Sequence, residues 1–112
     1  MKRLTTVERL GLAALALHES IATLTAARAE KRSAFELAQI PADSDFEALT
    51  EGEREIVAAP VQRFKDARRA VKKARSALRR LSVAYLRAQR EQERLEASQG
   101  LQQIELFSEE TL

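Results

Sequence analysis

Apolar residues recur at alternating spacings of three and four along the first third of the chain. The apolar positions are Val7, Leu10, Ala14, Leu17, Ile21 and Leu24, and the same spacing continues through Arg28, Lys31, Phe35 and Ala38. Such a heptad pattern is typical of a helix that packs one side against another helix. Thr5 and Glu8 match a capping box at its start. Because Pro41 disfavours helical geometry at the preceding residue, we predict a helix over about 6–39.

A second heptad pattern follows a connecting segment at residues 40–50. Thr50 and Glu53 form another capping-box match, which predicts a second helix over about 51–98. Pro60 lies inside this helix and lacks a backbone N–H, so we expect a kink or a break there. The paired positions of the second pattern are Val57/Pro60, Phe64/Ala67, Val71/Ala74, Leu78/Leu81, Tyr85/Ala88 and Gln92/Leu95.

Two helices of similar length joined by a short connection are typical of an antiparallel hairpin. The chain of 112 residues is therefore predicted to be all-α, with one two-helix coiled-coil hairpin over residues 1–99. Glycine commonly follows the last turn of a helix, so Gly100 is expected to begin an extended, flexible C-terminal tail over residues 100–112. The predicted register brings together Val7 with Leu95, Ile21 with Leu78, and Phe35 with Phe64.

Four apolar residues lie off both heptad patterns, and the predicted register places them at one level near the chain termini. They are Leu12, Leu15, Val83 and Leu86. A single hairpin would expose them as one apolar patch, and such patches usually mark interfaces. We therefore predict a homodimer that forms a four-helix bundle at this end. The alternative is that these are isolated apolar residues of the kind found on most protein surfaces.

The composition excludes several classes of function. Without cysteine the chain has no disulfide, zinc–thiolate site or thiol nucleophile, which suits a reducing cytoplasm. His18 is the only histidine, and no Gly-rich phosphate loop or Ser/His/Asp set is present. We therefore expect no enzyme activity, no metal and no cofactor.

We also expect no membrane contact. The longest apolar run, Leu10–Leu17, is far shorter than the roughly 20 residues that a membrane-spanning helix needs. Lys2 and Arg3 precede this run, as basic residues do in a secretory signal peptide. Glu8 and Arg9 border the run, however, and the helical pattern continues past it, which argues against a signal peptide.

Charge is segregated along the second half of the chain, although 19 Lys and Arg nearly balance 17 Asp and Glu. Residues 63–80 contain nine basic residues and one acid, whereas residues 43–55 and 91–112 each contain six acids and one arginine. Basic density of this kind attracts phosphate backbones through Coulomb attraction and counterion release. Because no aromatic residues interleave with the basic ones between 65 and 80, stacking on single-stranded bases is not expected.

We therefore predict non-specific binding to the backbone of double-stranded DNA, with RNA as an alternative. The side chains assigned to this contact are Arg68, Arg69, Lys72, Lys73, Arg75, Arg79 and Arg80. Two plainer interpretations stay open. The basic residues could form a solvated helix face, or they could pair with the acidic segments of the same chain in a dimer.

The segment Gln103-Ile104-Glu105-Leu106-Phe107 carries the most specific motif in the chain. It resembles the pentapeptide by which bacterial replication and repair proteins bind the DNA sliding clamp, whose pattern is Gln-Leu-(Ser or Asp)-Leu-Phe. Gln103, Leu106 and Phe107 match this pattern, and Ile104 and Glu105 are conservative replacements. The resemblance covers five of 112 residues.

This resemblance implies a role for most of the motif. Leu106 and Phe107 would fill an apolar pocket on the clamp, Ile104 would cover neighbouring apolar surface, and Gln103 would form a hydrogen bond at the pocket rim. The alternative is that Leu101, Ile104 and Phe107, spaced by three, form a last amphipathic turn that packs on the hairpin.

Taken together, these features favour a non-enzymatic accessory protein of bacterial or phage DNA replication or repair. It would dimerise through its hairpins, contact DNA with its second helix and bind the sliding clamp with its tail. Whether the clamp contact recruits an activity or blocks the clamp stays open. The alternative is a structural or regulatory coiled-coil module that binds another protein, with an accidental match in the tail.

Overall fold

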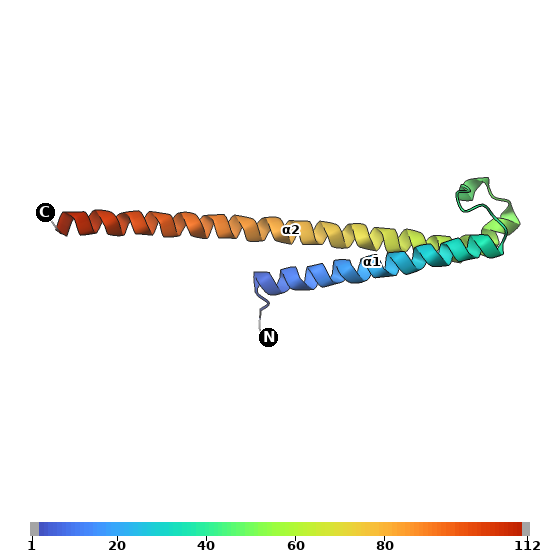
Figure 1. The fold of residues 1–112 in the computed structure, drawn as a ribbon, viewed down its shortest axis with the longest axis horizontal. Coiled ribbons are helices and arrows are strands. Elements are labelled where there is room, and N and C mark those ends of the chain that lie inside the picture. Colours follow the sequence, from blue (N-terminus) through green and yellow to red (C-terminus); the bar gives the residue numbers. More distant parts are fainter. Residues whose placement is uncertain (1–2, 111–112) are drawn as a thin grey trace.

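The chain forms a long helical hairpin. The computed structural model describes the backbone of residues 3–110 and the side chains of residues 3–102. Its elements are helix α1 (Thr6–Leu37), the short 3-10 helix η1 (Phe46–Ala48) and helix α2 (Glu51–Glu110). The helices α1 and α2 run antiparallel and side by side, and the molecule measures 91 × 32 × 16 Å (Figure 1). The predicted all-α two-helix hairpin is confirmed.

Local signals set three of the four ends of α1 and α2. The Thr5 hydroxyl accepts a hydrogen bond from the backbone N–H of Glu8 at 3.1 Å, as the first capping box predicts. At the start of α2, the Thr50 N–H donates to Glu53 Oε1 at 3.0 Å, and the Glu53 N–H donates to Thr50 Oγ1 at 3.3 Å. These hydrogen bonds with Thr50 lower the pKa of the Glu53 carboxyl below its usual value.

Helix α1 ends two residues earlier than predicted, in a left-handed turn. Gln39 has φ 57°, and its N–H donates to the Glu36 carbonyl at 3.0 Å. The Ile40 N–H donates to the Phe35 carbonyl at 2.9 Å. This pair of hydrogen bonds is a Schellman motif, and it carries Ile40 back into contact with Phe35 in the core.

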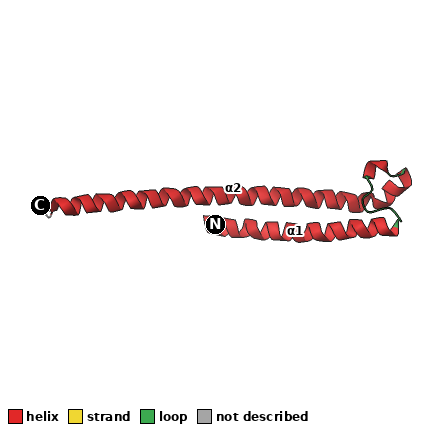
Figure 2. Cartoon of the chain, turned by 45° about the horizontal axis from the view of Figure 1, so that its top comes forward, coloured by secondary structure: helices red, strands yellow, loops and turns green. Residues whose placement is uncertain are grey.

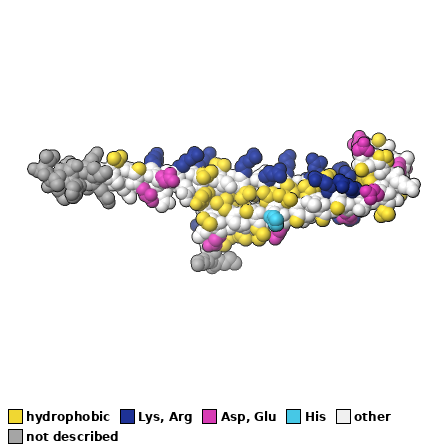
Figure 3. All heavy atoms as spheres, viewed as in Figure 1, with side chains coloured by type: hydrophobic (Ala, Val, Ile, Leu, Met, Phe, Trp, Pro, Cys, Tyr) yellow, Lys and Arg dark blue, Asp and Glu magenta, His cyan; other side chains and the backbone are white. Residues whose placement is uncertain are grey.

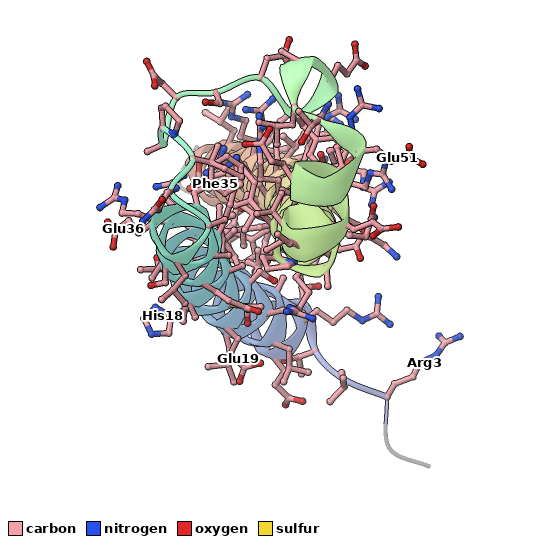
Figure 4. The ribbon with its side chains drawn as sticks, turned by 90° about the vertical axis from the view of Figure 1, so that its right-hand side faces the viewer. Arg3, His18, Glu19, Phe35, Glu36 and Glu51 are labelled. Carbon is pink, nitrogen blue, oxygen red and sulfur yellow. The ribbon has the colours of Figure 1, made fainter. Side chains whose placement is uncertain are left out.

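The core lies where the connection folds over the two helices, which we call the loop end. Its buried residues come from α1, the connection and the first turns of α2: Phe35, Ile40, Leu49, Val57 and Val61. Phe35 and Val57 are the most deeply buried, at 2% and 0% exposed. Figure 4 shows Phe35 pointing between the helices, whereas His18 and Glu19 point away from α2. The connection thus supplies a third layer that two helices alone would lack.

The face that α1 turns toward α2 differs in part from the prediction. Its shielded positions are Leu10, Ala13, Leu17, Ser20, Leu24, Ala27, Lys31, Ala34, Phe35 and Ala38. Val7, Ala14, Ile21 and Arg28, which were predicted on this face, are exposed, so that part of the prediction was wrong. The reason is that small side chains recur every seven residues, at Ala13, Ser20, Ala27 and Ala34. Small contact residues let two helix axes approach closely, and bulkier neighbours such as Ile21 are left outside.

Helix α2 extends well beyond the start of α1, because it has 60 residues and α1 has 32 (Figure 1). The predicted contact of Val7 with Leu95 is wrong, since the two side chains are 63% and 54% exposed. From Leu86 to Gln99 every side chain of α2 is exposed. The shielded seam of α2 instead runs from Val57 to Tyr85, as predicted for that stretch. We call the residues of α2 after Tyr85 the α2 extension.

Two further expectations for α2 need correction. Gly100 does not end the helix, and residues 100–110 are helical rather than extended. A single glycine costs a helix only about 1 kcal/mol relative to alanine, and Leu101 and Gln102 are good helix formers. At Pro60 the helix is not broken. Figure 2 shows α2 continuing as a helix from the loop end toward the C-terminus, so of the two expected outcomes the break is not observed.

Candidate nucleic-acid and partner interfaces

The basic residues of α2 form a ridge on the outside of the hairpin. All seven predicted side chains are exposed: Arg68, Arg69, Lys72, Lys73, Arg75, Arg79 and Arg80. We call this set the basic ridge. Figure 3 shows Lys and Arg side chains along the edge of α2 that faces away from α1. From Arg68 to Arg80 the ridge is roughly 18 Å long, because an α-helix rises 1.5 Å per residue.

Acidic side chains do not neutralise this ridge. In the part of the chain whose side chains are described, the two ion pairs join Arg63 to Glu30 and Arg94 to Glu91, and neither uses a ridge residue. Asp66, the one acid between residues 63 and 80, accepts a hydrogen bond from Gln62 Nε2 at 2.9 Å. The contact with Glu30 raises the pKa of the Arg63 guanidinium. The ridge therefore keeps its full positive charge available for a ligand.

An open groove of about 550 Å³ connects the ridge to α1. Its lining residues are Leu24, Lys65, Arg68, Arg69, Val71, Lys72 and Arg75. Four of the ridge residues thus border a concave surface. A groove with one sign of charge on its walls concentrates the electrostatic field there, and this attracts anions more strongly than a flat surface does.

The predicted dimer patch is exposed as expected. Leu12, Leu15, Val83 and Leu86 are each between 43% and 54% exposed. Val7 and Ile21 of α1 are also exposed, at 63% and 43%. Figure 3 shows hydrophobic side chains spread along α1 on the viewed face. Among the described side chains, none that precedes Ala27 is buried. This half of the hairpin, which we call the terminal end, therefore leaves most of its apolar surface in water.

Helix α1 is also long and apolar enough to cross a membrane, judged by length and composition only. It contains an 18-residue window with a mean hydropathy of 1.4, of which 6% is buried within the hairpin. Glu19 is the only Asp, Glu, Lys or Arg between Leu10 and Ala27. The expectation of no membrane contact rests on the longest unbroken apolar run, which ends at His18 and Glu19. Beyond Glu19 the helix is apolar again, and up to Ala27 only Ser and Thr interrupt it. A helix that is apolar on most of its faces is normally covered by other surfaces.

The clamp-like motif lies near the end of the α2 extension. The backbone of residues 103–107 is helical, and the side chains of Gln103 to Phe107 lie outside the described residues. Leu101, the last described apolar side chain before the motif, is 63% exposed. The motif is therefore carried on a part of α2 that α1 does not cover.

Within the described residues, no group of three His, Cys, Asp or Glu side chains could hold a metal ion. His18 is exposed on the side of α1 that faces away from α2 (Figure 4). The described surface is therefore characterised by charge and apolar patches.

Comparison with protein-family models, with curated proteins and with solved structures finds no match to this chain.

Proposed function

We propose that this protein acts without catalysis, as a DNA-binding accessory factor that is tethered to the bacterial sliding clamp in the cytoplasm. The basic ridge would bind the backbone of duplex DNA, and residues 103–107 would bind the clamp. The observation that carries the DNA contact is the ridge itself, with seven exposed cations and no acidic partner among the described side chains. The clamp contact rests on the sequence resemblance.

The helical backbone at the motif bears directly on the clamp contact. Adjacent residues of a helix point about 100° apart, so Leu106 and Phe107 would enter one pocket more readily from an extended peptide, and the motif would unwind on binding. This unwinding costs little, because a helical segment without a packing partner is only marginally stable in water. From Leu86 to Gln99 every side chain of the α2 extension is exposed, so we expect the turns beyond this stretch to open without disturbing the hairpin.

Self-association through the terminal end completes the proposal. The occupant that we propose for the apolar patch is a second copy of the chain, in which α1 and α2 of each copy contribute to a four-helix bundle. Residues 6–26 of α1 contain few charges, so two such surfaces can meet without burying unpaired ions. A dimer would also present two motifs to a ring that carries repeated sites, which raises the apparent affinity.

The DNA contact is tested by measuring the affinity of the full chain for a labelled duplex between 50 and 200 mM salt, where a contact to several phosphates loses roughly a thousandfold in affinity. Replacing Arg68, Lys72 and Arg75 with Gln should weaken binding and flatten the salt dependence. The matched control replaces Arg87, Arg90 and Arg94, which lie on the α2 extension. Affinity that does not change with salt, or equal losses in both variants, would contradict a contact at the ridge.

The clamp contact is tested with the full chain and purified bacterial sliding clamp. Leu106→Ala combined with Phe107→Ala should abolish binding, because the two anchors supply most of the apolar contact. Leu101→Ala is the matched control, as an exposed apolar residue of the same helix outside the motif. Unchanged binding by the double variant would show that the resemblance is accidental.

A second candidate function is a coiled-coil module that binds another protein through the hairpin, with no role for DNA or the clamp. The exposed apolar surface of the terminal end favours it. A chain that stays monomeric at tens of micromolar and binds neither duplex DNA nor clamp would support this candidate. If that monomer sedimented with anionic lipid vesicles, the apolar surface of the terminal end would instead be covered by a membrane.

A further inference from the structure

Three cationic side chains converge on the ring of Phe64, which is half-buried between the helices near the loop end. Lys31 Nζ lies 4.6 Å from the ring centroid, and the guanidinium carbons of Arg68 and Arg28 lie 5.7 and 5.9 Å from it. Arg28 and Lys31 belong to α1, whereas Arg68 belongs to α2. We call these four residues the Phe64 cluster, which exists only when the two helices are paired.

Grooves on either side of Lys31 open the cluster to solvent. The first, of about 230 Å³, is lined by Arg28, Lys31, Arg32, Phe35, Ala42 and Phe64. The second has a similar volume and is lined by Lys31, Phe35, Ser44, Asp45, Phe46, Val61, Phe64, Lys65 and Arg68. The two grooves together contain five cations and a single carboxylate, that of Asp45. The local charge is therefore strongly positive.

The cluster holds like charges together without an ion pair. Glu30, the neighbouring acid of α1, pairs with Arg63 and not with the cluster. The negative face of an aromatic ring attracts each cation separately. The three cations nevertheless repel one another. Arg28 and Arg68 are exposed, whereas Lys31 is half-buried, and at Lys31 this repulsion is screened less than in open solvent. An anion that accepts hydrogen bonds from two or three of them would remove the repulsion.

We propose that the Phe64 cluster binds a phosphate group of the duplex DNA backbone, so that α1 takes part in a contact otherwise made by α2. This inference rests on the proposed DNA-binding function. The guanidinium groups of Arg28 and Arg68 offer paired donors that match two phosphate oxygens, and Lys31 adds a compact positive charge. Arg68 belongs to both the cluster and the basic ridge, so the two surfaces are continuous.

The shared residue also defines the path of the duplex. From Arg68 the ridge continues toward Arg80, and the groove beside Leu24 follows the same side of the hairpin. A phosphate on the cluster would therefore fix one end of the backbone contact at the loop end. The remaining ridge residues would bind phosphates farther along α2.

The test compares two variants of the full chain that each lose two positive charges. Arg28→Gln with Lys31→Met removes the two α1 charges of the cluster, leaves Arg68 in place and keeps the aliphatic stem of residue 31. Arg3→Gln with Arg9→Gln removes two exposed charges just before α1 and in its first turn. For each we would measure the affinity for duplex DNA against salt concentration, and the affinity for inorganic tripolyphosphate. Circular dichroism would verify that both variants keep their helices.

We expect the cluster variant to lose roughly tenfold in DNA affinity, the size of a charged hydrogen-bond contact, and about one unit of the slope of log affinity against log salt. The control should change little in either quantity. Wild-type protein that binds DNA, with equal slopes in both variants, would overturn this inference alone.

Other outcomes separate the inference from the function that it rests on. Failure of the wild type to bind DNA would overturn both. If the wild type bound tripolyphosphate but not DNA, and only the cluster variant lost that binding, the cluster would be a site for free phosphates, and the assignment to a DNA backbone would be wrong.

Discussion

The loop end and the terminal end of this hairpin are built from the same two helices but bury apolar residues very differently. The eight buried hydrophobic residues of the described core all lie between Ala27 and Val71. At the terminal end, large apolar side chains such as Leu12, Leu15 and Leu86 stay about half exposed. The difference is the connection, because Ile40 and Leu49 fold over the helix pair and enclose Phe35 and Val57.

A helix pair by itself protects only a narrow strip of side chains from water. Each helix turns one face toward the other, and the remaining faces need a further layer. The chain provides that layer at one end only. We therefore expect mutations in the loop end to lower the stability of the folded hairpin, and mutations or dilution to affect the association of the terminal end.

The largest effect should come from the core of the loop end. Phe35→Ala should destabilise the folded hairpin by about 3–5 kcal/mol, because it removes the most deeply buried aromatic ring and leaves a cavity. Ile21→Ala, at an exposed position of the same helix, should cost less than about 1 kcal/mol in a dilute monomer. Urea unfolding followed by circular dichroism measures both. Similar losses would mean that the terminal end is also a closed core.

The next effect concerns association. Leu12→Glu combined with Leu86→Glu should raise the dimer dissociation constant by at least about a hundredfold, because it places charges in an apolar contact. The hairpin itself should keep its helicity. Leu37→Glu is the control, since Leu37 is the most exposed large apolar residue among the described side chains, at 87%, and lies at the loop end. Sedimentation equilibrium would contradict the prediction if all three proteins associated equally.

A smaller effect is expected at the start of α2. Thr50→Ala should destabilise the hairpin by about 1 kcal/mol, because it removes the capping hydroxyl. The capping contact also depends on pH. Since folding lowers the pKa of Glu53, its contribution is present above the usual glutamate pKa and is lost as the pH falls through the folded value. Thermal unfolding of wild type and Glu53→Gln should therefore differ at neutral pH and converge in acid.

The smallest effect is expected at the end of α1. Gln39→Gly should stabilise the loop end by up to about 1 kcal/mol, because a left-handed backbone strains a side chain but not glycine. Thermal unfolding measures the gain. A loss of stability would indicate that contacts of the Gln39 side chain outweigh its backbone strain.

Local signals in the sequence predicted the fold well. Thr5, Thr50 and Pro41 act on their own neighbours, so three helix ends and the hairpin could be predicted from them. The facing side of α1 could not, because it depends on how closely two backbones approach. The sequence contains a repeat of small residues at Ala13, Ser20, Ala27 and Ala34, but hydrophobicity alone favours the larger residues as contacts. Gly100 failed as a signal because one glycine is tolerated in a helix of good formers.

For the candidate surfaces too, features of a single helix could be predicted from the sequence, whereas features that depend on the packing of two helices could not be predicted in full. Exposure of the basic ridge and of Leu12 and Leu86 followed from periodicity, which fixes the face of a single helix. The Phe64 cluster could be predicted only in part, because the predicted register pairs Phe35 with Phe64 but does not give the positions of Lys31 and Arg68 around the ring. Register between helices is set by long-range packing, and a single sequence reports on it weakly.

The contrast between the two ends is tested most directly by amide hydrogen exchange of the full chain at concentrations well below and well above dimer formation. The backbone around Phe35, Leu49 and Val57 should be protected equally at both concentrations. Protection over residues 6–26 of α1, and over the stretch of α2 around Val83, should be weak in dilute solution and should rise strongly on concentration. Equal protection of α1 at both concentrations would contradict the account, because the terminal end would then need no second copy.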